Sequence, residues 1–116
     1  MDSKFSKEDL RYYRKDRLNT DYIRFMKTYR TLREEAKPNT KVKRVLLKNL
    51  CLAKIAKKTG LSHDMTRKRL REIRDFGVID YDELNIGTTT RIYFIFGKES
   101  SYLDRMLEKD KREKLL

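Results

Sequence analysis

Apolar residues recur along most of the chain at intervals of three or four positions, which is the spacing of one face of a helix. In two short segments the apolar residues alternate instead, as in a strand with one buried face. This pattern predicts helices over residues 6–17, 20–36, 40–59, 63–76 and 100–116, with a bend at Asn49 dividing the third into two short helices. It predicts strands over VIDYDEL (78–84) and TRIYFIF (90–96), joined by a turn at NIGTT (85–89).

Turn and cap residues set the expected ends of these helices. Ser6 and either Asn19 or Thr20 can cap the first two helices, and Pro38 requires a break near Lys37. Gly60 and Gly77 stand where a helix ends in a left-handed residue, and Ser62 can cap the helix between them. The helix over 63–76 therefore has the best-defined boundaries in the chain.

The charge of the chain is concentrated around this helix. The formal net charge is +12, and residues 37–77, with 13 basic and 3 acidic side chains, carry a net charge of +10. A basic segment of this kind favours a polyanionic partner, either nucleic acid or an acidic membrane surface. Charge alone does not distinguish these two partners, and a run of charge is often only a solvated helix face.

Other chemistries are less compatible with the composition. One cysteine (Cys51) and one histidine (His63) are too few for a disulfide, a thiolate zinc cluster or a multi-histidine metal site, so we expect no metal, no cofactor and no enzymatic activity. Cys51 is expected to be a small buried side chain. The chain has no apolar run long enough to span a membrane and no signal-peptide pattern, so we expect a cytoplasmic protein.

Four tyrosines could suggest a DNA-nicking nucleophile, namely Tyr12, Tyr13, Tyr22 and Tyr29. Such chemistry usually requires a pair of histidines to hold a metal ion, and this chain has one. We interpret these tyrosines as core or interface aromatics.

Residues 40–97 resemble the winged helix-turn-helix domain of bacterial and archaeal transcription regulators. The resemblance rests on IAKKTGLS (55–62) and on LREIRDFGVID (70–80), in which Leu70, Ile73, Phe76 and Gly77 lie at the family's spacing from Gly60. It implies a mostly α fold with a small β-hairpin. It also implies a helical extension over 1–37 and a C-terminal helix over 98–116, both available for dimerisation.

The resemblance further implies that the helix over 63–76 enters the major groove of DNA, which is about 12 Å wide and admits one helix. At 100° per residue, the side of this helix opposite Thr66, Leu70 and Ile73 carries the five residues expected to face the groove: His63, Asp64, Arg67, Lys68 and Arg71. Further expected contacts are Ser62 at its N-terminus, Lys54, Lys57 and Lys58 on the preceding helix, and Thr88, Thr89 and Arg91 at the hairpin.

The leading hypothesis is a DNA-binding transcriptional regulator that recognises sequence and forms a homodimer through its terminal helices. The stripe Leu103, Met106 and Leu107 is expected to pack on the partner's terminal helices. Three alternatives remain open: a replication or DNA-segregation factor with the same domain, a winged-helix adaptor that binds proteins, and an RNA-binding protein.

Overall fold

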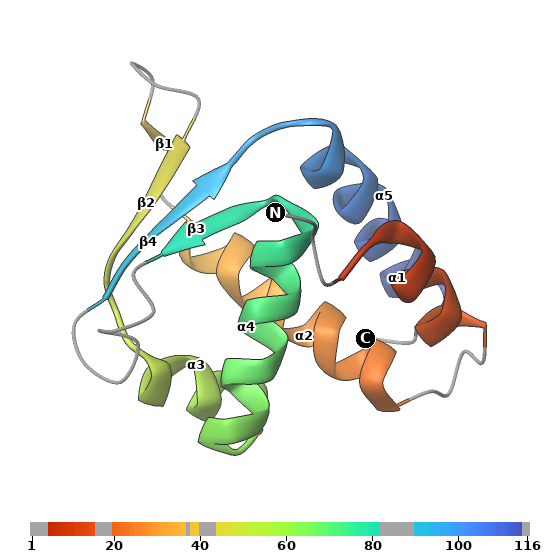
Figure 1. The fold of residues 1–116 in the computed structure, drawn as a ribbon, viewed down its shortest axis with the longest axis horizontal. Coiled ribbons are helices and arrows are strands. Elements are labelled where there is room, and N and C mark those ends of the chain that lie inside the picture. The colour runs from red at the N-terminus through yellow and green to blue at the C-terminus, as the bar shows by residue number, and fades with distance from the viewer. Residues whose placement is uncertain (1–4, 16–19, 37, 40–43, 82–89, 115–116) are drawn as a thin grey trace.

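The computed structural model describes residues 5–15, 20–36, 38–39, 44–81 and 90–114, and the other residues lie outside this description. The described part is mostly helical with an antiparallel sheet (Figure 1). The helices are α1 (Lys7–Arg14), α2 (Thr20–Glu35), α3 (Leu52–Thr59), α4 (His63–Phe76) and α5 (Lys98–Arg112). The strands are β1 (Pro38–Asn39), β2 (Arg44–Leu50), β3 (Ile79–Tyr81) and β4 (Thr90–Ile95).

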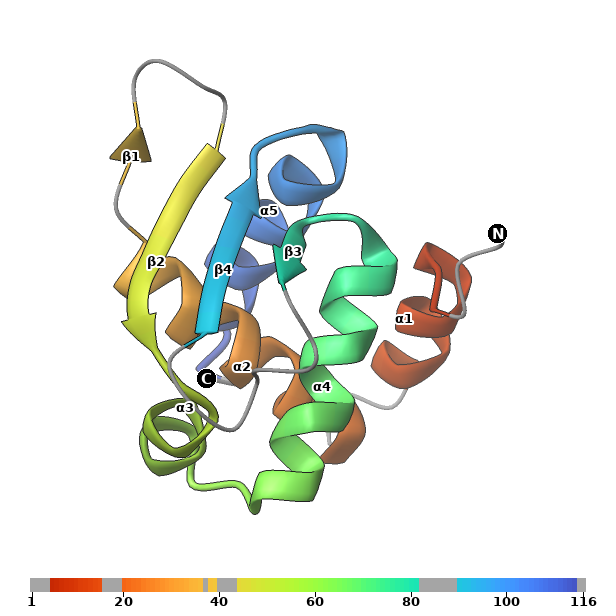
Figure 2. The same cartoon turned by 60° about the vertical axis from the view of Figure 1, so that its left-hand side comes forward.

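The sheet is antiparallel throughout, with the strand order β1-β2-β4-β3 that Figure 2 shows side by side. Ile79 pairs with Phe94 and Tyr81 with Ile92, so β3 and β4 form the predicted antiparallel hairpin pair. Strand β2 pairs with the other edge of β4. The turn predicted at 85–89 lies outside the described residues.

The prediction of a helix over residues 40–50 is wrong, because the described part of this segment forms β2. Apolar residues at 45, 46, 47 and 50 fit one helix face, but a short apolar run does not distinguish a helix from a strand. Pairing with β4 decides the conformation here, since it gives the backbone of β2 its hydrogen-bonding partners.

The helix boundaries follow the cap residues closely. Ser6 accepts a hydrogen bond from the Asp9 backbone while the Asp9 carboxylate accepts one from the Ser6 backbone, which is a capping box at the start of α1. Gly60 ends α3 with φ of 75° and Gly77 ends α4 with φ of 97°, both left-handed as predicted. The Ser62 hydroxyl accepts a hydrogen bond of 3.2 Å from the Met65 amide and so caps α4.

One hydrophobic core joins the terminal helices to the rest of the described chain. Tyr22 and Tyr29 of α2 are fully buried, as expected for core aromatics, whereas Tyr12 is exposed. Leu103 and Leu107 of α5 are buried in the same core. Two of the three residues of the predicted dimer stripe are therefore covered within the chain, and the third, Met106, is half-buried.

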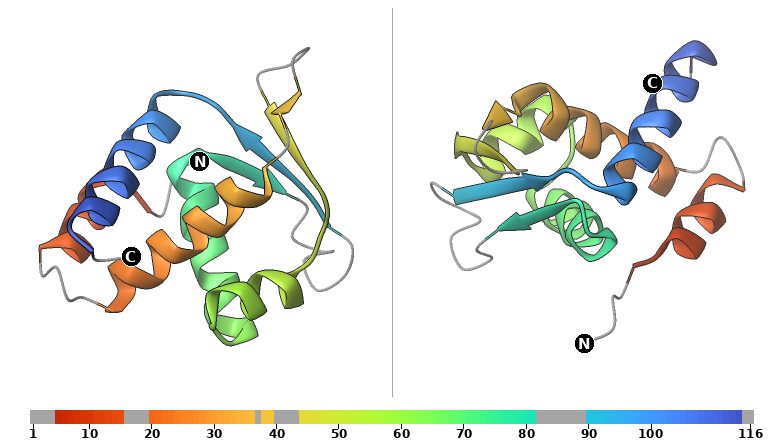
Figure 3. Two further views of the ribbon diagram at one scale, coloured as in Figure 1. Left: turned by 180° about the vertical axis from the view of Figure 1, so that it is seen from behind. Right: turned by 90° about the horizontal axis from the view of Figure 1, so that it is seen from above.

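Carboxylates of α5 fix this helix to the N-terminal helices. The buried Asp110 accepts hydrogen bonds from Arg14 at 3.0 Å and from the Tyr22 hydroxyl. Asp104 accepts from the Tyr29 hydroxyl at 2.5 Å and forms an ion pair with Arg33 at 2.9 Å. Figure 1 shows α2 passing behind α4, and Figure 3 shows α1 and α5 at the same end of the molecule.

Smaller predictions around α3 and α5 need correction. Helix α5 begins at Lys98 with Gly97 as its N-cap, two residues before the predicted start at residue 100, and the buried Ser100 hydroxyl donates to the Ile95 carbonyl at 2.6 Å. Phe96 is 40% exposed, while Ile92 and Phe94 of the same alternating pattern are buried. Cys51 is half-buried and forms the N-cap of α3 rather than a core position.

Candidate nucleic-acid interface

Helix α4 has one face in the core and one face in solvent. Thr66, Leu70 and Ile73 are fully buried, as predicted, and Phe76 is nearly so. The Thr66 hydroxyl donates to the Ser62 carbonyl at 2.7 Å, so this polar side chain is satisfied in the core. The buried face fixes the rotation of α4 and therefore which residues point outward.

The five residues expected to face a groove all lie on the solvent side of α4. His63, Asp64, Lys68 and Arg71 are exposed, and the Arg67 side chain is 37% exposed. Arg67 donates to Asp64 at 2.9 Å, one turn earlier on the same helix. An ion pair as open as this is weak, since Asp64 is 95% exposed, and an incoming phosphate or base can replace it at little cost.

The lysines of α3 form a second group of exposed cations before α4 in the chain. Lys54, Lys57 and Lys58 are all exposed. Lys54 and Lys58 form ion pairs with Glu35 at the end of α2, the former at 3.5 Å. Within the described residues, Lys57 has no ion pair. Glu35 therefore offsets part of the positive charge that the sequence places here.

Of the three hairpin residues predicted to contact DNA, the structure describes only part of one. Thr88 and Thr89 lie outside the described residues. Arg91 lies in β4 next to the turn region, and its backbone alone is described. The predicted contacts that the structure brings together are thus those of α3, Ser62 and α4.

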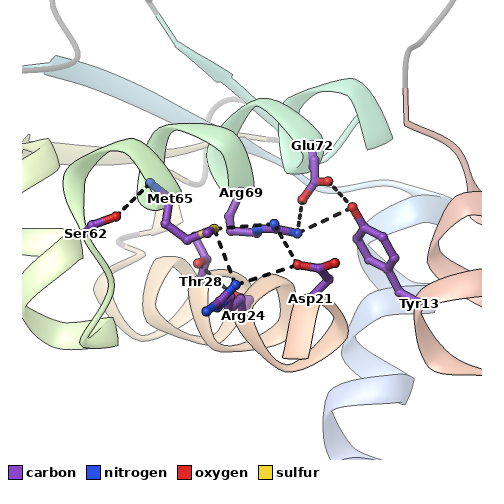
Figure 4. A network of polar contacts seen from close by, with 8 residues as sticks. All are labelled: Tyr13, Asp21, Arg24, Thr28, Ser62, Met65, Arg69 and Glu72. Carbon is purple, nitrogen blue, oxygen red and sulfur yellow. Dashed lines mark hydrogen bonds and ion pairs between the residues drawn. The ribbon is translucent and has the colours of Figure 1, made fainter. Parts of the chain in front are cut away.

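Sequence reasoning missed a buried arginine in α4. Arg69 is 0% exposed, the largest fully buried side chain in the described chain. Its guanidinium donates to Glu72 at 2.9 Å on α4 and to Asp21 at 3.1 Å on α2, and Figure 4 shows these contacts. Tyr13 of α1 completes the group, since its hydroxyl donates to Glu72 at 2.6 Å.

This cluster of Arg69, Glu72, Tyr13 and Asp21 joins α4 to both N-terminal helices. Burial raises the pKa of Glu72 above its ordinary value, and the nearby Arg69 and the Tyr13 hydrogen bond oppose that rise without cancelling it. Burial, together with the hydrogen bond to Glu72, raises the pKa of Tyr13 to about 12. Burial is the main cause of both raised pKa values, which indicates that the cluster is desolvated and lies on the inner side of α4.

The sequence contained a signal for this cluster. At 100° per residue, position 69 lies between positions 65 and 73, on the inner half of the helix. Glu72 follows Arg69 at the three-residue spacing of helical ion pairs. An arginine on the core side requires a buried carboxylate partner, and Asp21 of α2 could not be identified without the fold.

No protein family model, curated protein or solved structure matches this chain. Within the described ranges, no group of three or more His, Cys, Asp or Glu side chains is placed to hold a metal ion. None of the described helices combines the length and the apolar character needed to cross a membrane. The arrangement of α3 and α4 is therefore the basis for a functional proposal.

Proposed function

We propose that this protein binds double-stranded DNA by inserting α4 into the major groove, reads sequence there, and acts as a transcriptional regulator. The observation that carries the proposal is the division of α4 into a buried face and a solvent face bearing Arg67, Lys68 and Arg71. A helix fixed from behind can hold its outer side chains in register with base edges.

The order of the elements supports a winged helix-turn-helix interpretation. Helix α3, the turn at Gly60 and helix α4 are followed directly by the antiparallel strands β3 and β4. In such domains the second helix of the turn is the one that contacts base edges. We assign that role to α4, with α3 beside the phosphate backbone.

The side chains on α4 have suitable chemistry for this role. An arginine can bond both the O6 and N7 atoms of guanine, and a lysine at the groove edge can bond phosphate. We assign Arg67 and Arg71 to bases or phosphates and Lys68 to phosphate, while Asp64 can accept from a cytosine amino group. The exposed lysines of α3 add sequence-independent phosphate contacts.

Selection from a pool of random DNA duplexes tests sequence recognition. We expect the wild-type protein to enrich a defined motif, and we expect a variant with Arg67, Lys68 and Arg71 replaced by alanine to enrich none. A palindromic motif with half-sites one helical turn apart would support a dimer. Recovery of the same unenriched pool by both proteins would contradict the proposal.

The same proteins distinguish the competing functions. A protein adaptor should bind its partner equally well with and without the three α4 cations. An RNA-binding protein should retain single-stranded RNA in preference to duplex DNA. Footprinting of the selected motif on genomic DNA then separates regulation from replication, because a regulator should protect promoters and a replication factor should protect an origin.

A further inference from the structure

A second basic region lies away from α4, between the first and last helices. Helices α1 and α5 lie at the same end of the molecule (Figure 3). Side chains of both helices line an open concavity of about 340 Å³, formed by Arg11, Arg14, Lys15, Tyr102, Met106 and Lys109. Four of the six lining residues are cations, and the other two supply an aromatic ring and a thioether.

Three of the four cations of this concavity have no acidic partner in the described part of the chain. Arg11, Lys15 and Lys109 are exposed and form no ion pair there, whereas Arg14 pairs with Asp110. By contrast, Lys54, Lys58 and Arg67 each pair with a carboxylate. Like charges that converge on one concave surface raise the local potential and attract anions.

Arg14 is held in place with donors remaining for a ligand. Its Nε atom donates to the Tyr22 hydroxyl at 3.1 Å, and its Nη2 atom donates to Asp110 at 3.0 Å. Its Nη1 atom makes no hydrogen bond to the described part of the chain. Asp110 is fully buried beneath Arg14, and Glu113 approaches the guanidinium only to 4.0 Å. The fixed guanidinium therefore retains two N–H groups for an anion.

We propose that the concavity between α1 and α5 binds a small phosphorylated organic molecule, with its phosphate on the basic side chains and its carbon portion on Tyr102 and Met106. Arginine and lysine together suit a phosphate dianion, and the volume falls in the range of small-ligand sites. The proposal does not depend on DNA binding by α4, because no residue is shared between the two regions.

Binding at this site should restrain α1 relative to α5, to which the Arg14–Asp110 ion pair already connects it, since the ligand would contact both helices. Arg14 adjoins Tyr13, whose hydroxyl contacts Glu72 of α4. A bound ligand would therefore restrain α1, the helix whose Tyr13 supports the inner face of α4.

Titration of the full chain with phenyl phosphate, followed by amide signals in NMR spectra, tests the proposal. We expect shifts confined to α1 and α5 that saturate, and no shifts with benzyl alcohol, which lacks the charge. Inorganic phosphate should bind more weakly than phenyl phosphate, because it cannot contact Tyr102 and Met106. Equal shifts with benzyl alcohol, or equal affinity for inorganic phosphate, would overturn the proposal.

A charge-matched pair of variants locates the site. Replacing Arg11 and Lys109 with alanine should raise the Kd for phenyl phosphate about tenfold or more, since both side chains supply charged hydrogen-bond donors to the phosphate. Replacing Arg105 and Lys111, which are exposed on α5 outside the concavity, should change it less than about twofold because of salt screening. Both variants alter exposed side chains, and thermal unfolding checks that each is folded. Equal weakening in the two variants, or shifts with a DNA duplex but none with phenyl phosphate, would refute a small-molecule site.

Discussion

Arg69 and Arg71 lie two residues apart on α4 and have opposite environments. Arg69 is fully buried and contacts Glu72 and Asp21, whereas Arg71 is exposed on the solvent face. At 100° per residue the two positions are about 200° apart around the helix axis, which places one arginine against α2 and the other toward solvent. A count of basic residues in this segment therefore overstates the charge available to a partner, and the orientation of each side chain is needed as well.

The comparison is tested most strongly by removing each arginine in turn. Arg69→Ala leaves Glu72 buried without its cation, and breaking a buried ion pair in this way costs about 3–5 kcal/mol of unfolding free energy. Arg71→Ala, at an exposed position, should change it by no more than about 0.5 kcal/mol. Urea unfolding measures both variants.

A double variant provides the control for that experiment. Replacing Arg69 with methionine and Glu72 with glutamine removes both charges and keeps similar volume, so it should destabilise less than Arg69→Ala alone. Equal stability losses at positions 69 and 71 would contradict the assignment of one arginine to the core and one to solvent.

The end of α4 provides a smaller test that does not involve charge. Gly77 has φ of 97°, and a Cβ added there would meet nothing closer than the Glu99 Cγ atom at 4.0 Å. Gly77→Ala should therefore cost only the backbone penalty of a left-handed residue, about 1–2 kcal/mol. Replacing the exposed Lys68 with alanine should not destabilise the protein, since alanine favours a helix. Thermal unfolding of the two variants would show no difference if the left-handed cap were unimportant.

The pH dependence of the cluster is the smallest expected effect. Because the pKa of Glu72 is raised above 4.5 in the folded state, the folded protein binds this proton more tightly than the unfolded chain does. The resulting stabilisation is complete below pH 4.5 and is lost as the pH rises through the folded-state pKa. The unfolding free energy of the wild type should thus fall relative to that of Glu72→Gln as the pH rises from 4.5 through the folded-state pKa of Glu72. A difference that is constant with pH would contradict the raised pKa.

Much of the candidate site could be predicted from local sequence signals. Ser62, Gly60 and Gly77 define α4 because a cap and a left-handed turn depend on single residues. The solvent face of α4 followed from its periodicity. The prediction failed where a segment distant in the sequence decides the structure. Residues 44–50 form a strand and not the predicted helix because β4 pairs with them.

Buried polar contacts between helices were also beyond the reach of local patterns. Arg69 requires Asp21, which lies 48 positions earlier, and Arg14 requires Asp110, which lies 96 positions later. The apolar stripe on α5 was predicted to pack on a partner chain. Leu103 and Leu107 are instead buried in the core of the same chain, so the structure does not support that prediction for these two residues. Periodicity identifies a face to be covered and does not specify what covers it.

The claim that the solvent face of α4 binds duplex DNA is tested most directly by the affinity of two triple-alanine variants for one selected duplex. One variant replaces Arg67, Lys68 and Arg71. The other replaces Arg105, Lys111 and Arg112, which are exposed on α5, and so removes the same amount of positive charge. Fluorescence anisotropy in a salt titration should show the first variant binding at least about a hundredfold more weakly, with a salt slope lower by about two to three. The second variant should remain within a few-fold of the wild type. Equal loss of affinity in the two variants would contradict the account, because binding would then depend on net charge alone.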